Sequence, residues 1–321
     1  MATLALPVVD VTRTDAVEAL EQGLASLGFV ELIGHGASMA AARALRSACD
    51  DFFALDPQQK QAHVDPRPEA NRGWRAKGSE ALSYSLGDAS PPDLFESFNV
   101  ADDDQVTDHP LRASTPWPEA LVPDFRPAAH GWLRTMARLA HRLDALIDEI
   151  LGTTLAASSG HGPDTMACID YRPQPDGTEP SIDGQQRMGA HSDYTTFTIL
   201  HADPVPGLQI IGPDNEWVDV IPGRDSLLLN VGDLLAMLTN DRWPSTLHRV
   251  VPLDAGCAPV RRSVAYFHYP NLDVEVAPLA PFGEPRYLPV TVEDHLLDKL
   301  AAPKVHQPST GASTAAGRLN S

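Results

Sequence analysis

The sequence contains little cysteine and little positive charge, and both shortages exclude classes of protein. Its three cysteines, Cys49, Cys168 and Cys257, are odd in number, far apart and without a Cys-x-x-Cys pair. They therefore predict neither a disulfide framework nor a cysteine zinc site. Lysine and arginine total 24 against 43 aspartates and glutamates, giving a formal net charge of −19. This balance argues against nucleic acid and against a polybasic membrane anchor, because both need clustered positive charge.

Long hydrophobic runs are also missing. The longest apolar stretch, residues 226–238, is interrupted by Asn230, Gly232 and Asp233, so it cannot span a bilayer. The first residues lack the basic segment and long apolar segment of a secretory signal. Together with the scarce cysteines, these features predict a cytoplasmic protein that does not associate with membranes.

Hydrophobic spacing divides the 321 residues into a helical first part and a strand-rich second part. Apolar residues at helical spacing predict helices over residues 14–27, 38–55 and 128–151, with a short strand at 28–33. Residues 64–118 are rich in Pro, Gly, Asp and Ser and predict loops with short elements.

Short runs rich in Val, Ile, Thr and Leu recur after about residue 164, separated by turn residues. They lie at residues 166–171, 195–201, 207–211, 217–221, 226–231, 247–251 and 263–269. Seven or eight strands at this spacing predict a sandwich or barrel rather than a parallel α/β sheet. We therefore expect an N-terminal helical and loop region (1–120), a β-rich core with its long helix (121–300) and a disordered tail (301–321).

His191, Asp193 and His248 are candidate metal ligands. Residues two apart on a strand share a face, so His191 and Asp193 can reach one ion together. His248 lies in another strand-like run, 55 positions beyond Asp193. Two histidines and one carboxylate leave about three positions open on an octahedral ion, as non-haem Fe(II) oxygenases require. Taken alone, the pattern also fits a surface turn plus an unrelated core histidine, because the chain has 12 histidines.

Arg261 and Ser263 are candidate ligands for a carboxylate. They are two residues apart, so on a strand they also share a face. Arginine grips a carboxylate through two parallel hydrogen bonds, and serine can add a third. A dicarboxylate cosubstrate would chelate iron at one end and meet Arg261 at the other. Taken alone, Arg261 and Arg262 also fit two surface arginines on an edge strand.

These residues stand in an order that resembles the 2-oxoglutarate- and Fe(II)-dependent dioxygenases of the isopenicillin N synthase-like group. The resemblance runs over residues 191–200, 207–210, 231–235, 238–240, 245–250, 261 and 263, and over the N-terminal motifs at 7–10, 28–30 and 35–36. So many motifs in the family's order cover most of the chain apart from its tail.

The resemblance implies a mainly β fold with flanking helices, built on a double-stranded β-helix or jelly-roll core. It implies that the three candidate metal ligands bind Fe(II), and that Arg261 and Ser263 bind the distal carboxylate of 2-oxoglutarate. Tyr171 stands where many members have a tyrosine that contacts this cosubstrate. The implied enzyme uses O₂ to oxidise an unactivated C–H bond of a small-molecule substrate, by default hydroxylating it, and releases succinate and CO₂.

Two departures from the family's pattern lie on the substrate side. Residues 170–173 read Asp-Tyr-Arg-Pro where many members have Asn-Tyr-Tyr-Pro, and residues 95–96 read Phe-Glu where many have Lys-Glu. The substrate is therefore not predicted. The candidate substrate residues are Arg172, Tyr84, Phe95, Phe98 and Phe267. Arg172 also fits a surface arginine, and Tyr84, Phe95 and Phe98 also fit ordinary packing.

Two alternatives stay open at this point. An oxidase of the same fold can keep the Arg-x-Ser pair yet use no 2-oxoglutarate. A non-catalytic small-molecule receptor can use the same scaffold, although the intact His-Asp-His set argues against it. A zinc hydrolase is disfavoured because the sequence has no His-Glu-x-x-His motif.

Overall fold

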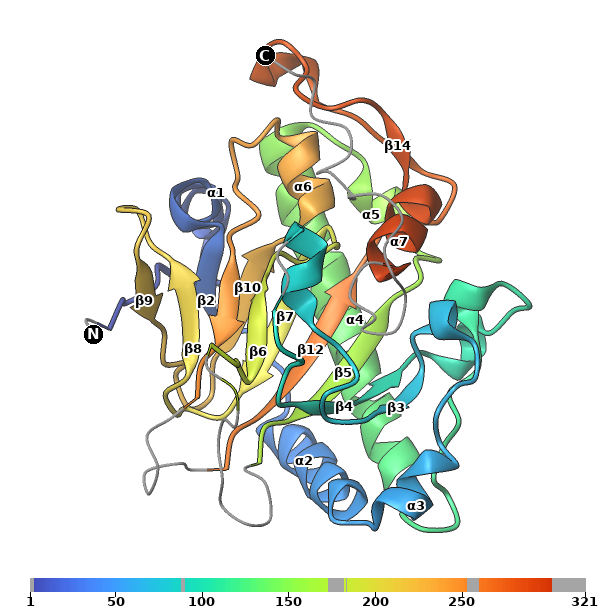
Figure 1. Cartoon of the computed structure of the whole chain (residues 1–321). Helices are drawn as coiled ribbons and strands as arrows, with labels where there is room; N and C mark the ends of the chain where they lie inside the picture. Colours follow the sequence, from blue (N-terminus) through green and yellow to red (C-terminus); the bar gives the residue numbers. More distant parts are fainter. Residues whose placement is uncertain (1–2, 88–89, 173–181, 183, 253–259, 302–321) are drawn as a thin grey trace.

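Two β-sheets form the centre of the computed structural model, which describes residues 3–87, 90–172, 182, 184–252 and 260–301 (Figure 1). The larger sheet has eight strands, in the order β1 (Val8–Asp10), β2 (Phe29–Ile33), β10 (Leu227–Val231), β7 (Phe197–Ala202), β12 (Arg262–His268), β5 (Thr165–Asp170), β4 (Glu96–Val100) and β3 (Gly73–Arg75). The smaller sheet has four, in the order β6 (Met188–His191), β11 (His248–Val250), β8 (Leu208–Ile211) and β9 (Trp217–Asp219). A separate hairpin pairs β13 (Glu275–Val276) with β14 (Val290–Thr291).

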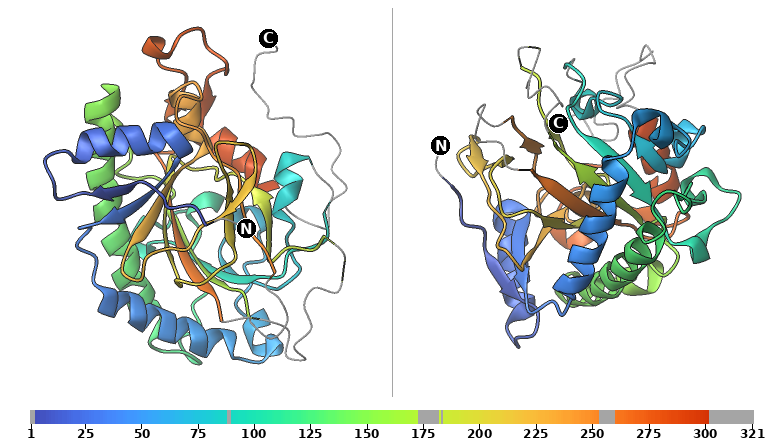
Figure 2. Two further views of the ribbon diagram at one scale, coloured as in Figure 1. Left: turned by 90° about the vertical axis from the view of Figure 1, so that its left-hand side faces the viewer. Right: turned by 90° about the horizontal axis from the view of Figure 1, so that it is seen from below.

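Helices cover the outer face of the larger sheet. The helices are α1 (Ala16–Leu27), α2 (Met39–Phe53), α3 (Pro57–Gln61), α4 (Phe125–Leu151), α5 (Leu155–Ser158), α6 (Asp233–Leu238) and α7 (Val292–Ala301), and the 3₁₀ helices are η1 (Pro68–Ala70), η2 (Leu82–Leu86), η3 (Asp103–Gln105), η4 (Pro110–Arg112) and η5 (Ala280–Phe282). Figure 2 shows α2 in blue and α4 in green crossing one another beside the strands, and their residues pack together. None of the helices in the described ranges is both long and apolar enough to cross a membrane.

Alternation along the strands of the larger sheet separates a helix-facing core from a cavity-facing surface. On β5, Met166 and Cys168 join the large core cluster with α2 and α4, whereas Ala167 and Ile169 line the cavity between the two sheets. Successive side chains of a strand point to opposite faces, so this inward set is fixed by the register of the sheet.

One glycine joins the helical part to the sheet. Helix α1 ends at Gly28, which has φ 66° and donates its N–H to the carbonyl of Leu24 at 2.9 Å. A Cβ atom there would lie 2.1 Å from the carbonyl oxygen of Pro244. Gly28 is therefore needed both for the left-handed turn and for the close approach of the chain before β11.

The expected fold class is confirmed: the molecule is mainly β with flanking helices, in the sheet arrangement of a jelly roll. The helix expected over residues 128–151 begins earlier, at Phe125. Strands from both sides of residue 120 pair in one sheet, so the division at that residue stays a prediction. Cys257 and the expected disordered tail from residue 302 lie outside the described residues.

Candidate metal and cosubstrate site

Three side chains from neighbouring segments of the smaller sheet meet at one point. His191 ends β6, His248 begins β11, and the two residues are directly paired in register. Asp193 lies two residues after His191, beyond the end of β6. The sequence argument placed both side chains on one face of a strand, and it therefore does not account for the position of Asp193. The ligand atoms of all three residues lie within 4.8 Å of one another.

The spacing of these atoms suits one face of a coordination sphere. Asp193 Oδ1 lies 3.8 Å from His191 Nε2 and 3.7 Å from His248 Nε2. Adjacent ligands of an octahedral ion at about 2.1 Å are separated by about 3 Å. A bound ion would therefore shorten each of the two distances from Asp193 to an imidazole by less than about 1 Å, and the distance between the two imidazole nitrogens, which is at most 4.8 Å, by less than about 2 Å.

Backbone carbonyls orient the two imidazoles. His191 Nδ1 lies 2.8 Å from the carbonyl oxygen of Gly189, and His248 Nδ1 lies 3.2 Å from that of Thr246. Because a carbonyl only accepts, Nδ1 carries the proton in both rings. Each Nε2 therefore presents a lone pair to the shared point.

The carboxylate of Asp193 is held in the same way. Its Oδ2 accepts hydrogen bonds from Thr198 Oγ1 at 2.6 Å and from Asn230 Nδ2 at 2.7 Å. The other oxygen, Oδ1, is left facing the imidazoles. Sequence reasoning missed Thr198 and Asn230 because nothing in their local pattern distinguishes them from other polar residues on β7 and β10.

The charge states of the site suit a divalent cation. Burial, together with the neighbouring His248, lowers the pKa of His191 to about 4, so this ring is neutral at pH 7. Burial acts to raise the pKa of Asp193, but the two imidazoles and the hydrogen bonds from Thr198 and Asn230 outweigh it and lower the pKa. Asp193 is therefore an ionised carboxylate beside a neutral imidazole, the donor combination that Fe(II) accepts.

Arg261, Ser263 and Tyr171 line the same cavity, which has a volume of about 150 Å³. The guanidinium carbon of Arg261 lies 4.7 Å from the centre of the Tyr171 ring, and Ser263 Oγ lies 3.4 Å from the Tyr171 hydroxyl. Arg261 is 1% exposed, yet its Nε and Nη1 have no hydrogen-bond partner in the described part of the chain. A buried cation with unpartnered N–H groups is costly to keep, so these residues fit an anionic ligand such as a carboxylate.

The structure brings two of the five candidate substrate residues to the cavity. Phe95 and Phe267 line it, and Tyr84 in η2 is not among its described lining residues. Phe98 requires a correction: it points to the other face of β4 and packs in the helix-facing core against Phe52. The reason is strand alternation, because a residue next to cavity-facing Ser97 must face away.

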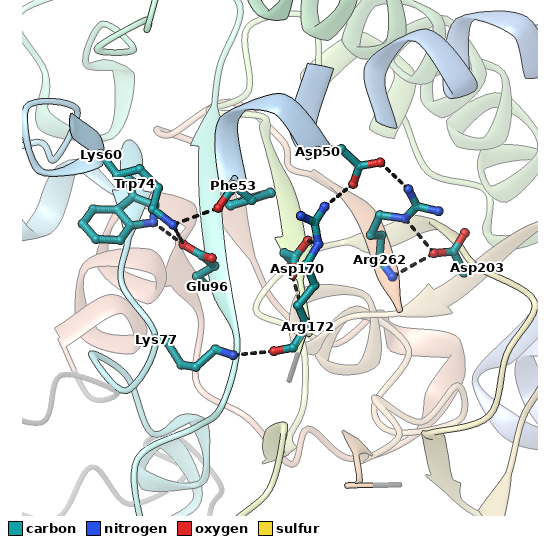
Figure 3. Close-up of polar contacts among 10 residues, drawn as sticks. All are labelled: Asp50, Phe53, Lys60, Trp74, Lys77, Glu96, Asp170, Arg172, Asp203 and Arg262. Atoms are coloured by element: carbon teal, nitrogen blue, oxygen red, sulfur yellow. Dashed lines mark hydrogen bonds and ion pairs between the residues drawn. The ribbon is translucent and has the colours of Figure 1, made fainter. Parts of the chain in front are cut away.

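Arg172 does not line the cavity among the described residues either, and its guanidinium belongs to an ion-pair network, so its contact with substrate stays a prediction (Figure 3). Its guanidinium pairs with Asp50 of α2, and its Nε lies 2.9 Å from Asp170 Oδ2. Asp50 also binds Arg262, with Oδ2 2.6 Å from Nη1, and Arg262 Nε lies 3.0 Å from Asp203 Oδ2. The two arginines that follow Tyr171 and Arg261 are therefore tied to one carboxylate of α2.

The cavity also contains polar residues that sequence reasoning missed. They are Asn71, Arg75, Glu80, Ser97 and Asn99. A signal existed on β4: Ser97 and Asn99 alternate with Phe98 and Val100, the period-two pattern of a strand with one apolar face.

Comparison with known proteins agrees with this geometry. The family model of the 2OG-Fe(II) oxygenase superfamily matches residues 163–270, and that of the N-terminal region of a non-haem dioxygenase in morphine synthesis matches residues 6–120. Validamycin A dioxygenase from Streptomyces hygroscopicus subsp. limoneus is 29% identical over 318 residues, covering 92% of this chain and 86% of that protein. Clavatol oxidase claD from Penicillium crustosum is 28% identical, covering 92% of this chain and 96% of that protein.

A solved structure supports the same conclusion. A full-length Neurospora crassa protein, crystallised in complex with alpha-KG, superposes with a TM-score of 0.79 at 26% identity, covering 93% of this chain and 97% of that chain. Relatives that are named dioxygenases, and a similar structure that holds the cosubstrate, favour an oxygenase over both the oxidase without 2-oxoglutarate and the receptor. The chain therefore belongs to the 2OG-Fe(II) oxygenase superfamily and is an Fe(II)- and 2-oxoglutarate-dependent oxygenase.

Proposed function

We propose that His191, Asp193 and His248 hold the Fe(II), and that Arg261, Ser263 and Tyr171 bind 2-oxoglutarate, so that a small molecule in the cavity is oxidised at an unactivated C–H bond. Bound Fe(II) and 2-oxoglutarate supply the O₂ activation, with release of succinate and CO₂. Hydroxylation is the outcome that we expect by default.

One observation carries this assignment. The three candidate ligand atoms, within 4.8 Å of one another, share a cavity with a buried guanidinium that lacks partners on Nε and Nη1 among the described residues. His191 and His248 lie on the smaller sheet, whereas Arg261 directly precedes β12 of the larger sheet. A ligand that chelates the ion at one end and meets Arg261 at the other would therefore bridge the two sheets.

The other residues of the site act by position. The Tyr171 ring packs on the Arg261 guanidinium and limits its rotation. Thr198 and Asn230 hold Asp193 with one oxygen free. Phe95 and Phe267 give the substrate chamber apolar walls, which keep water from the reacting carbon.

Anaerobic titration with Fe(II) and then 2-oxoglutarate tests the proposal. The wild-type protein should develop the weak visible charge-transfer band of a chelated 2-oxoglutarate, and a metabolite screen should then find succinate release that depends on both additions. The variant Asp193→Ala should lose the band and bind Fe(II) at least about 10-fold more weakly, as expected for a lost ligand.

The matched control is Asp214→Ala, which removes an exposed aspartate between β8 and β9. It should titrate like the wild type. Unchanged Fe(II) affinity in Asp193→Ala would refute the ligand assignment. Turnover without 2-oxoglutarate would favour the oxidase, and cosubstrate binding without turnover on any compound would favour the receptor.

The small cavity supports a compact substrate. It measures about 150 Å³ in this protein. The same Neurospora crassa protein crystallised with alpha-KG and thymine, 25% identical to this chain, indicates that a similar fold admits a single small ring.

The cytoplasm stays our prediction for the compartment. Two buried free thiols, Cys49 and Cys168, support it, because reducing compartments keep such thiols reduced. Fractionation of cells that produce the protein would check it.

A further inference from the structure

The cavity has a second polar end, formed by Asn71, Arg75 and Asn99. These residues lie on or beside β3 and β4, at one edge of the larger sheet. Thr198 and Asn230, which hold the metal-site carboxylate, lie on β7 and β10, and β12 and β5 separate the two groups. The proposed metal site and this second end are therefore opposite poles of one chamber.

Asn99 is the buried centre of this pole. Its side chain is 6% exposed, and its Nδ2 donates a hydrogen bond to Asn71 Oδ1 at 2.8 Å. Its Oδ1 is buried and accepts no hydrogen bond within the described ranges. A buried acceptor without a donor costs free energy, so this oxygen points to a ligand.

Asn71 completes a matched pair of groups. Its Nδ2 makes no hydrogen bond to any residue that the structure describes, so the hydrogen-bonded pair offers an acceptor on Asn99 and a donor on Asn71. If both side-chain amides are flipped by 180°, Asn71 offers the acceptor and Asn99 the donor, so the pair still has one acceptor and one donor without a partner. A complementary ligand edge therefore carries an N–H beside a C=O in either case.

The charge at this pole is balanced. Arg75 Nη1 lies 2.8 Å from Glu80 Oε1, and the Arg75 Nε is buried without a partner among the described residues. A carboxylate or phosphate here would have to compete with Glu80, whereas a neutral polar group would not. Apolar side chains line the space between the poles, namely Phe95, Ala167, Ile169 and Phe267.

We infer that the substrate is a compact neutral molecule with a cis-amide edge, such as a lactam, cyclic imide or pyrimidine, held by Asn99 and Asn71 with its reacting carbon toward the metal ligands. The inference rests on the proposed function, because the opposite pole is the proposed iron site. In this arrangement Asn99 and Asn71 select the substrate, and the proposed iron site carries out its oxidation.

Anaerobic calorimetry on the protein loaded with Fe(II) and 2-oxoglutarate tests it. The probes are piperidin-2-one and thymine, which carry the edge, against N-methylpiperidin-2-one, cyclohexanone and 1,3-dimethylthymine, which lack the N–H. The wild type should bind the first pair at least about 10-fold more tightly, because each analogue leaves a buried acceptor unpaired.

Variants locate the preference. In Asn99→Leu the affinities for the probes with and without the N–H should differ by no more than about twofold. Asn71→Gly should weaken the preference as well, and glycine suits the left-handed backbone at that position, where φ is 50°. Ser97→Ala, on the same strand as Asn99 and lining the same cavity, should keep it.

The charge-transfer band of the same samples shows whether a negative result contradicts the proposed function or only the inferred substrate class. A sample without the band has lost the iron and 2-oxoglutarate chemistry, and the proposed function fails. If the band forms but the wild type shows no preference for the N–H probes, or binds none of them, the inferred substrate class is wrong. A preference that survives both Asn99→Leu and Asn71→Gly would remove these residues from the substrate site.

Discussion

The buried guanidinium of Arg261 lowers the stability of the ligand-free protein and at the same time suits the binding of a carboxylate. It is 1% exposed and leaves two N–H groups unpartnered in the described structure. Removing a buried charge that lacks a partner relieves its desolvation cost. The same removal deletes the two-pronged grip on a carboxylate, which lysine cannot restore.

We therefore expect Arg261→Met to separate the two effects. Without ligands, its melting temperature should equal or exceed that of the wild type. Addition of 2-oxoglutarate with Mn(II) should raise the melting temperature of the wild type but not of the variant, because binding to the native state alone stabilises it. Thermal denaturation with and without these ligands is the measurement. A variant that melts lower without ligands would show that Arg261 is mainly structural.

His268 provides a second test at the level of one residue. It is buried between two carboxylates, with Nε2 2.9 Å from Asp144 Oδ2 and Nδ1 3.0 Å from Asp164 Oδ2. Burial alone would lower its pKa, but the two carboxylates outweigh burial and raise the pKa to about 10. His268 is therefore an imidazolium in the folded protein at neutral pH.

The sign of the pH dependence follows from that shift. A folded pKa above the unfolded value of about 6.5 adds stability that is complete below pH 6.5 and is lost as the pH rises through about 10. Urea denaturation should show that His268→Gln lowers the free energy of unfolding by several kcal/mol at pH 7 and by clearly less at pH 10. An equal loss at both pH values would mean that the ring is neutral throughout.

The sequence could indicate candidate residues for the iron and cosubstrate site because their chemistry restricts the choice. Few side chains bind Fe(II) or grip a carboxylate, so His191, Asp193, His248 and Arg261 stand out in order and spacing. Substrate residues lack such a restriction. The sequence does not say which face of β4 points to the cavity. This is why Phe98 was predicted to face the cavity and why its neighbours Ser97 and Asn99 were missed.

At the level of elements, the long helices and the apolar strands were predictable from periodicity. β3 was not, because it has only three residues, and the alternation along β4 was overlooked because it lies in a stretch rich in proline and glycine, residues 64–118, for which loops were predicted. Their place at the edge of the larger sheet depends on pairing with β5, a contact between residues about 70 positions apart. Local patterns carry no information about such a pairing.

Helix α2 is linked to the proposed cosubstrate site by Asp50. This carboxylate binds Arg172 and Arg262 (Figure 3), which directly follow Tyr171 and Arg261 and are not among the described residues that line the cavity. The backbone N–H of Tyr171 also donates to the carbonyl of Arg261 at 3.1 Å. Asp50 therefore ties together the two strand ends from which the proposed cosubstrate residues project.

We expect Asp50→Asn to raise the KM for 2-oxoglutarate about two- to fivefold while kcat stays near that of the wild type. The size is modest because Asp50 is 35% exposed and solvent screens its ion pairs. Initial rates at varied 2-oxoglutarate provide the measurement. Asp51→Asn, the exposed neighbour on α2, is the control and should change neither constant. A fall in kcat with an unchanged KM would show that Asp50 does not position the cosubstrate residues.

At the scale of the whole molecule, the acidic balance has a consequence of its own. The 43 acidic and 24 basic side chains leave a net charge of −19. Self-repulsion of this size opposes the compact state, and salt screens it over about 10 Å at 0.1 M. Salt screens the partly buried ion pairs around Asp50 less than it screens exposed charges. Added salt should therefore weaken these attractions less than it weakens the repulsion among the excess carboxylates.

We therefore expect the melting temperature to rise by roughly a few °C when NaCl increases from about 10 to about 200 mM. KCl at the same ionic strength should act equally, which separates charge screening from effects specific to one ion. A melting temperature that falls with added salt would show that attractive ion pairs outweigh the repulsion among the excess carboxylates.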